Sequence, residues 1–488
     1  MPPSFAKQPP AEEQHGHVRP KYKLHEIKSG AVESVKHFVS SHHCAWLTAA
    51  ILLQIVTISF FLNRATLPSP SYTTALTSAQ ARRDDVCEFG RIYVYHLPAL
   101  LNQDLLDNCH ELAPWSSRCT ALSNNGFGPP AAELAAVIPY NLTPAWYWTD
   151  LYAGEPIFHH RIMNNYKCRT MYEDQATAFY IPFYVGLAVG KHLWSNYKSK
   201  DRDFHSLAML NWIKDQSPWK KSNGSDHFIM MGRLTWDFRR LSDKDNEWGS
   251  RFLYMPLMKN VLHLTVERSP WDPLEISVPY PTPFHPRSES DIDKWHDFIR
   301  ARTRSTLFSY VGGTRKSFKN DFRGVLMSYC RNESSSCKLV DCSITPCYDG
   351  APAMIEAVLD SVFCLQPKGD GYTRRSAFDC MLAGAIPVYF WKGSFENQYE
   401  WFLPVEAGSY SVFIDNNDVR NGSAIIKDVL EKYSTEDVQR MREKIIEFMP
   451  RFLYSKSNAN LGRFKDAFDI TMDEVLRRFK KQKDGVNV

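Results

Sequence analysis

Apolar and polar positions follow strand-like and helix-like periods along most of the chain, and they predict alternating strands and helices. Short apolar runs predict buried strands at 90–98, 178–184, 227–231, 260–266 and 306–311. Between them, apolar residues recur with a helical period at 187–197 and 289–304. This alternation is typical of an α/β protein and argues against an all-β sandwich.

The segment 361–390 is the most informative about chemistry. Two apolar runs flank a glycine turn and a short helix, which predicts one β–α–β unit. A helix N-terminus beside such a turn binds anions, and arginines strengthen the site. The candidate binding residues here are Lys368, Gly369, Arg374, Arg375 and Ser376.

Asp379 lies four residues after Arg375, so both project from one face of the predicted helix. A diphosphate held by arginine, with a carboxylate near the ribose hydroxyls, would make a nucleotide-sugar site. A simple i,i+4 ion pair between Arg375 and Asp379 is the competing interpretation.

A second glycine turn follows the strand predicted at 306–311. Gly312 and Gly313 are followed by Arg315, and successive backbone N–H groups in such turns can cradle a phosphate. We therefore add these three residues to the candidate donor-binding set.

The proline-dense segment 278–286 suits neither a helix nor a central strand, and we place the crossing between two domains there. We predict an acceptor-binding Rossmann-like domain at 86–300, a nucleotide-sugar-binding Rossmann-like domain at 301–450, and C-terminal helices at 451–488. Two such domains facing a cleft form the GT-B architecture.

The N-terminal region predicts a membrane anchor. Residues 44–62 are 19 uncharged residues, which would span about 28 Å as a helix. Basic residues are frequent before this run and scarce after it, which places the N-terminus in the cytosol. A cleaved signal peptide would have a shorter apolar run and a shorter leader.

We predict a cytosolic tail at 1–43, a transmembrane signal anchor at 44–62 and a flexible luminal stem, rich in Ser, Thr, Ala and Pro, at 63–85. This single-pass type II layout, with the catalytic part in the lumen, is common among glycosyltransferases of the Golgi membrane. Other type II ectodomains share it.

Composition excludes some partners. The formal net charge is only +4, and no Lys/Arg block of the kind that marks a nucleic-acid binder is present. The chain has 13 tryptophans and 23 tyrosines. Most are expected to pack in cores, but a carbohydrate groove would use some for stacking on sugar rings.

Cysteine usage agrees with an oxidising compartment. Cys330, Cys337, Cys342 and Cys347 crowd one polar stretch, and we expect two disulfides among them. A zinc site is the alternative, but their spacing lacks a C-x₂-C knuckle. Cys364 and Cys380 lie in the apolar β–α–β unit and are expected to be buried thiols.

No metal or other cofactor is expected. Three Asp-x-Asp strings occur in polar surroundings without a buried strand before them, and we interpret them as solvated charge; they begin at Asp201, Asp243 and Asp291. Stabilisation of a leaving diphosphate would then fall to basic side chains and the helix dipole.

The donor segment resembles the signature of the exostosin-like plant glycosyltransferases of family 47. There, an arginine-rich turn precedes an acidic residue that stands five positions before Gly-x-Ile-Pro-Val, as Asp379 does before residues 384–388. Further strings are similar to the xyloglucan galactosyltransferase group of this family, at 124–129, 157–159, 181–184, 226–228 and 278–281. The similarity extends over roughly 88–480.

This resemblance implies a GT-B enzyme of cell-wall synthesis that transfers galactose, with inversion, from UDP-galactose to xylosyl side chains of xyloglucan. Its partners would be the UDP-sugar, the xyloglucan acceptor, the Golgi membrane and other Golgi wall-polysaccharide glycosyltransferases. Inversion needs a base for the acceptor hydroxyl. We rank Asp226 and His227 first for this role, ahead of Glu155, His159 and Asp237.

Two alternatives remain. A galacturonosyltransferase would use UDP-galacturonate, and Lys368, Lys392 or Arg315 could bind the extra carboxylate. A non-catalytic Golgi subunit that binds glycan is the other. The intact set of donor-binding residues argues against it.

Overall fold

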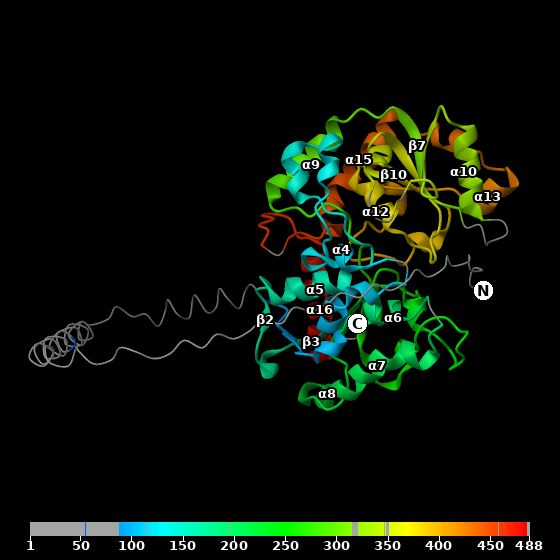
Figure 1. The fold of residues 1–488 in the computed structure, drawn as a ribbon. Helices are drawn as coiled ribbons and strands as arrows, with labels where there is room; N and C mark the ends of the chain where they lie inside the picture. The colour runs from blue at the N-terminus through cyan, green and yellow to red at the C-terminus, as the bar shows by residue number, and fades with distance from the viewer. Residues whose placement is uncertain are drawn as a thin grey trace, which may run out of the picture. The chain divides into compact units, whose positions relative to one another are not determined.

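The computed structural model describes residues 87–114, 116–194, 196–314, 321–345, 351–456 and 458–485, together with Gln54 and Cys347 (Figure 1). The chain divides into two compact units, Met1–Asp85 and Val86–Val488, and every element below belongs to the second. The predicted tail, anchor and stem, apart from Gln54, lie outside the described residues, as does Arg315. Within the described part of the chain, no helix has the length and apolar character needed to cross a membrane.

The first sheet is parallel and has the strand order β2-β1-β3-β4-β5-β6. Its central strands β3 and β4 are buried along their whole length, which is why their sequences are unbroken apolar runs. The strands are β1 (Ile92–Val94), β2 (Arg169–Thr170), β3 (Ala178–Ile181), β4 (His227–Met231), β5 (Leu262–Thr265) and β6 (Glu275–Ser277). The predicted α/β organisation is confirmed.

The described residues between β1 and β4 form six α-helices: α3 (Gln103–Asp107), α4 (Cys119–Leu122), α5 (Gly154–Met163), α6 (Val185–Gly190), α7 (Ser199–Ile213) and α8 (Ser217–Ser222). Helix α6 is shorter than the helix predicted at 187–197. It ends at Gly190, a residue of low helix propensity.

The second sheet is also parallel, in the order β11-β10-β9-β7-β8. Its strands are β7 (Thr306–Gly312), β8 (Cys337–Asp341), β9 (Ser361–Gln366), β10 (Ile386–Tyr389) and β11 (Val412–Phe413). Strands β7 and β9 are neighbours in the middle of the sheet. The chain adds β8 on the side of β7, and it adds β10 and β11 on the side of β9. In open α/β sheets, ligands bind beyond the carboxyl ends of the strands at such a switch point. The two glycine turns singled out in the sequence follow these two strands.

The predicted β–α–β unit is confirmed. Strands β9 and β10 pair in parallel, with Phe363 opposite Ile386, and α12 (Arg375–Leu382) connects them. The helix begins at Arg375, with Arg374 as its N-cap residue. Helices α10 (Phe322–Asn332) and α11 (Pro352–Leu359) complete the crossovers.

Ten cysteines form five disulfides: Cys87–Cys168, Cys109–Cys119, Cys330–Cys337, Cys342–Cys347 and Cys364–Cys380. The expected two bridges in the crowded stretch are confirmed. The expectation of buried thiols at Cys364 and Cys380 is wrong. Helix α12 crosses β9 so closely that these Cα atoms lie 6.2 Å apart, within the range that a disulfide spans.

The proline-rich segment 278–286 forms neither a helix nor a ladder strand, as predicted. It leads into α9 (Glu289–Ala301), whose Trp295 packs against Trp146, with ring centroids 4.9 Å apart. The indole of Trp295 donates a hydrogen bond to the Leu382 carbonyl, 2.9 Å away, at the end of α12. Trp295 thus joins the connecting segment to both parts of the chain. The part that carries the first sheet is called the first half below, and the part that carries the second sheet is called the second half.

The last helices are α13 (Asn416–Asn421), α14 (Ile426–Leu430), α15 (Thr435–Phe448) and α16 (Ala467–Lys483). Helix α16, red in Figure 1, returns to the first sheet. Its Lys480 and Lys483 donate to the carbonyls of Glu88 and Ala176, and Asp466 before it pairs with Arg161 of α5 at 2.7 Å.

Candidate functional site

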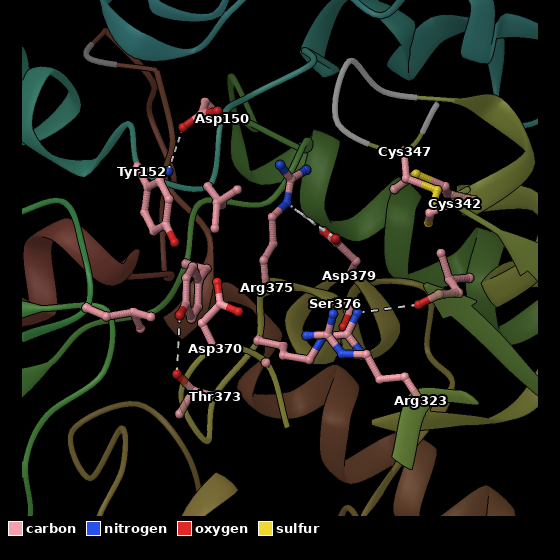
Figure 2. Close-up of a pocket in the computed structure, with 17 residues that line it drawn as sticks. Asp150, Tyr152, Arg323, Cys342, Cys347, Asp370, Thr373, Arg375, Ser376 and Asp379 are labelled. Atoms are coloured by element: carbon pink, nitrogen blue, oxygen red, sulfur yellow. Dashed lines mark hydrogen bonds and ion pairs between the residues drawn. A yellow bond between two sulfur atoms is a disulfide. The ribbon is translucent and has the colours of Figure 1, made fainter. Parts of the chain in front are cut away.

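A pocket of about 270 Å³ lies at the carboxyl ends of both sheets (Figure 2). The first half contributes Asp150, Leu151, Tyr152, Leu234 and Tyr280 to its lining. The second half contributes Val311, Arg323, Cys342, Cys347, Met354, Gly369, Asp370, Thr373, Arg374, Arg375, Ser376 and Asp379. Five predicted donor-binding residues therefore meet in one place: Gly369, Arg374, Arg375, Ser376 and Asp379.

The glycine turn after β9 is held by a carboxylate from the first half. Both the backbone N–H and the hydroxyl of Thr373 donate to Glu267, each at 2.6 Å. A Cβ on Gly371 would lie 2.0 Å from the same carboxylate, so only glycine allows this approach. Burial raises the pKa of Glu267, and the bonds from Thr373 offset part of that rise.

Three arginines supply the positive charge of the pocket. Arg375 donates to the Thr149 carbonyl of the first half and pairs with Asp379 at 3.3 Å. Figure 2 shows its side chain extending into the pocket. Arg374 donates to the Val311 carbonyl at 3.4 Å, at the end of β7. Arg323, at the start of α10, donates to the carbonyl of Lys368 at 3.4 Å.

Asp379 takes part in both arrangements considered from the sequence. It forms the i,i+4 pair with Arg375, and it also lines the pocket. Burial is the largest influence on its carboxyl and raises the pKa, although Arg375 acts in the opposite direction. A group that lines a cleft and pairs with its arginine can orient that arginine for a ligand.

Ser376 also helps to fix the pocket wall, whereas Lys368, Gly312 and Gly313 do not line the pocket. Ser376 donates to Gln366 at 2.7 Å, which fixes α12 to β9. Lys368 is not among the lining residues, and its ammonium lies 5.4 Å from the centre of the Trp391 ring. Gly312 and Gly313 follow the lining residue Val311 without lining the pocket themselves.

Asp226 and His227 do not reach the pocket. They stand at the amino end of β4, whereas the pocket lies beyond the carboxyl ends of the strands. His227 is fully buried, its ring stacks on Tyr95 and Phe179, and its Nδ1 lies 2.7 Å from the Asp226 carboxylate. Their placement away from the pocket does not favour the prediction that one of them is the base.

Glu155 is a buried anchor at the start of α5. Its carboxylate accepts backbone hydrogen bonds from Gly186 at 2.5 Å, Leu187 at 3.2 Å and Gly232 at 3.1 Å. It therefore holds the N-terminus of α6 and the chain after β4 together. Burial raises the pKa of Glu155 to about 7, against the opposing effect of these N–H groups.

The two remaining base candidates are also engaged elsewhere. His159 bonds the Tyr184 hydroxyl at 2.8 Å, and burial lowers its pKa to about 4. Asp237 accepts from Arg233 at 2.6 Å and from the Trp248 indole at 2.7 Å. Neither residue lines the pocket.

Asp150 and Arg323 were not found from the sequence. Asp150 is the one carboxylate that the first half contributes to the described lining. It pairs with Arg118 and accepts from the Tyr152 N–H at 2.8 Å. Its sequence signal is weak, an acidic residue in a short loop before a helix. Arg323 had a better signal, because it opens the helix after the Gly312–Gly313 turn.

The Asp-x-Asp strings have structural roles in part. Asp203 is buried and pairs with Arg240, and Asp291 is buried and pairs with Arg287 at 2.8 Å. Solvated charge is therefore wrong for these two, because each neutralises a neighbouring arginine. Asp243 is exposed as expected. Among the described residues, no group of three or more His, Cys, Asp or Glu side chains is arranged to hold a metal ion.

The raised pKa of Glu155 predicts a pH dependence of stability. The folded protein binds this proton more tightly than the unfolded chain, so wild-type stability falls as pH rises from about 4.5 to about 7. The Glu155→Gln variant has no carboxyl group at this position, so its stability does not fall over this pH range for this reason. From pH 5 to pH 8, we expect the variant to gain roughly 2 to 3 kcal/mol of unfolding free energy relative to wild type.

Urea unfolding at both pH values, with the disulfides intact, measures this difference. Glu447→Gln, on the exposed face of α15, is the matched control and should show no such change. Parallel pH profiles for Glu155→Gln and wild type would contradict the assignment.

Comparison with known proteins identifies the family of the chain. The model of the Exostosin GT47 domain matches residues 86–429. The chain is 54% identical over 399 residues to Xyloglucan galactosyltransferase XLT2 of Arabidopsis thaliana, covering 82% of this chain and 77% of that protein. It is 40% identical to Xyloglucan galactosyltransferase MUR3 of the same plant, covering 83% and 65%.

Another relative from Arabidopsis thaliana is named for the transfer of a different sugar. Xyloglucan-specific galacturonosyltransferase 1 is 38% identical, covering 81% of this chain and 58% of that protein. Among solved structures, a glycosyltransferase from Rickettsia africae aligns with 80% of this chain and 99% of its own, at 9% identity and a TM-score of 0.32, which is too low to establish a common fold. The match over residues 86–429 and the identity to the plant enzymes show that the chain belongs to the exostosin GT47 family.

Proposed function

We propose that this protein transfers galactose from UDP-galactose to xylosyl side chains of xyloglucan. The observation that carries the proposal is the pocket itself. Arginines of the second half, at a strand switch point, face a carboxylate of the first half. Membership of the exostosin GT47 family and the 54% identity to a xyloglucan galactosyltransferase support the substrate pair.

Donor binding follows from charge and geometry. Arg374 and Arg375 stand at the N-terminus of α12, and Arg323 at that of α10. Both helix ends and all three guanidinium groups favour an anion in the pocket, which would be the donor diphosphate. The same groups stabilise the negative charge that develops on UDP as it leaves. We propose that they do so without a metal ion.

Inversion requires the acceptor to attack from the side opposite the leaving UDP. The xylosyl hydroxyl oxygen bonds to the anomeric carbon of galactose, the bond from that carbon to the UDP oxygen breaks, and a base takes the hydroxyl proton. We propose Asp150 as this base. It follows Thr149, whose carbonyl binds Arg375, so base and donor arginine lie on facing walls of one pocket.

The cellular setting is part of the proposal. The uncharged run at 44–62 would anchor the protein in the Golgi membrane with residues 86–488 in the lumen. The five disulfides suit that oxidising compartment. Other Golgi glycosyltransferases that act on wall polysaccharides would be its neighbours.

The direct test is product mass. A luminal fragment from residue 86 is incubated with xylosylated xyloglucan oligosaccharide and EDTA, and UDP-galactose and UDP-galacturonate are offered separately. A gain of one hexose is the expected result. A gain of one hexuronic acid instead would identify the galacturonosyl alternative. No product from either donor would contradict the proposal, and activity that requires a divalent ion would contradict its metal-independent step.

Arg375→Ala should weaken UDP binding at least tenfold, because it removes a charged, two-pronged donor from the pocket. Arg375→Lys should recover only part of the loss, since a lysine lacks the fork. Isothermal titration with UDP measures both. Arg440→Ala, on an exposed face of α15, is the control and should bind UDP as wild type does. Unchanged affinity in Arg375→Ala would remove this residue from the donor site.

Asp150→Asn should lower kcat by about 100-fold to 10,000-fold, the usual loss of a general base, with UDP affinity within about twofold of wild type. Asp226→Asn, at the far end of β4, is the matched control and should retain its kcat. Initial rates with saturating donor and acceptor decide between them. A loss of kcat in Asp226→Asn, together with wild-type kcat in Asp150→Asn, would instead identify Asp226 as the base.

A further inference from the structure

Three tryptophans form an aromatic cluster on the first half of the protein. The rings of Trp236 and Trp248 stack with centroids 5.6 Å apart, and Trp194 meets Trp248 edge to face at 4.9 Å. Trp236 is 39% exposed and Trp194 is 41% exposed. Large aromatic rings are seldom left this open next to one another without a ligand or partner.

The cluster lies close to the pocket wall along the chain. Trp236 lies in the short 3₁₀ helix η7 (Thr235–Phe238), two residues after the lining residue Leu234. Their Cα atoms are at most about 7 Å apart, the reach of two extended residues. The cluster therefore begins within two residues of the pocket lining, on the half that carries Asp150.

A hydrogen-bonded connection fixes the cluster to this wall. Asp237 accepts a hydrogen bond from the Trp248 indole at 2.7 Å and another from Arg233 at 2.6 Å. The Arg233 guanidinium in turn lies 4.4 Å from the centre of the ring of Tyr152, which lines the pocket. The rings are thus held in place relative to the site of chemistry, which a binding platform requires.

The charges that support the cluster favour an uncharged ligand. Arg233 pairs with Asp237, and Arg240, which also donates to the Gly249 carbonyl next to Trp248, pairs with Asp203. Within each pair, the two opposite charges neutralise each other. An apolar, ring-shaped surface whose supporting charges are already paired suits the C–H faces of neutral pyranose rings.

We propose that Trp194, Trp236 and Trp248 bind the glucan backbone of the acceptor outside the pocket. This inference rests on the proposed function. A polymeric acceptor must extend beyond a pocket of about 270 Å³, and its backbone glucose rings would stack on these indoles while one xylosyl branch enters the pocket. These three tryptophans form a binding platform that raises the affinity for the acceptor. The affinity is higher for longer chains, because more backbone rings can stack.

The test compares acceptors of two lengths. Trp236→Ala and Trp194→Ala should each raise KM for a long xyloglucan oligosaccharide about tenfold, the value of one lost aromatic contact with its buried area. With the disaccharide of xylose on glucose, which cannot reach the platform, the variants should match wild type. The values of kcat and of the Kd for UDP should stay within about twofold in both.

Two further variants separate stacking from structure. Trp236→Phe keeps an aromatic face and should recover most of the affinity for the long acceptor. Phe204→Ala, an exposed aromatic on α7 that is 53% exposed, should leave KM unchanged. Wild-type KM for the long acceptor in both Trp→Ala variants would overturn the platform, as would an equal rise in KM for the disaccharide.

Failure of the proposed function has a different outcome. If the wild-type enzyme transfers no sugar to xyloglucan, the platform is measured by calorimetry with cellohexaose, an unbranched β-glucan. Binding to wild type that is lost in Trp236→Ala would support the platform alone. Absent binding, or equal binding to both proteins, would overturn it.

Discussion

The pocket depends on one buried carboxylate. Glu267 follows the last-but-one strand of the first sheet and binds Thr373 of the second half through two hydrogen bonds of 2.6 Å. The chain can bring this turn so close only because residue 371 is glycine. Arg375 reinforces the contact by donating to the Thr149 carbonyl. These contacts fix the arginine-bearing turn relative to the half that holds Asp150.

The same arrangement separates stabilising charges from those available to a ligand. Glu155, Glu267 and Asp237 are buried and saturated with hydrogen bonds from the protein. In the pocket, by contrast, three arginines line a space that also receives carboxylates from both halves. Positive charge beside a proton acceptor is the requirement for an inverting sugar transfer.

Local patterns were enough to predict seven of the eleven described strands and the β–α–β unit, and they singled out five of the residues that line the pocket. Their signals, apolar periodicity and a glycine turn before a helix, lie within about thirty residues of one another. Asp150 could not be found in this way, because it shares the pocket with Arg375, which lies 225 positions further along the chain. Glu267 was not predicted either, because its contact with Thr373 also joins two distant parts of the chain.

Asp226 and His227 lie outside the pocket for a different reason. The family-like string at 226–228 singled them out, but they stand at the amino end of β4, and ligands of open α/β sheets bind beyond the carboxyl ends of the strands. The disulfide between Cys364 and Cys380 likewise depends on how closely α12 crosses β9. Apolar surroundings alone could not distinguish a bridge from two thiols.

The most direct measurement is an experimental structure of the luminal part with UDP bound. The diphosphate oxygens should lie between the guanidinium groups of Arg374 and Arg375, near the N-terminus of α12, with the terminal phosphate facing Asp150 across the pocket. UDP bound away from the turn at 368–374, or a diphosphate directed away from the first half, would contradict the site described here.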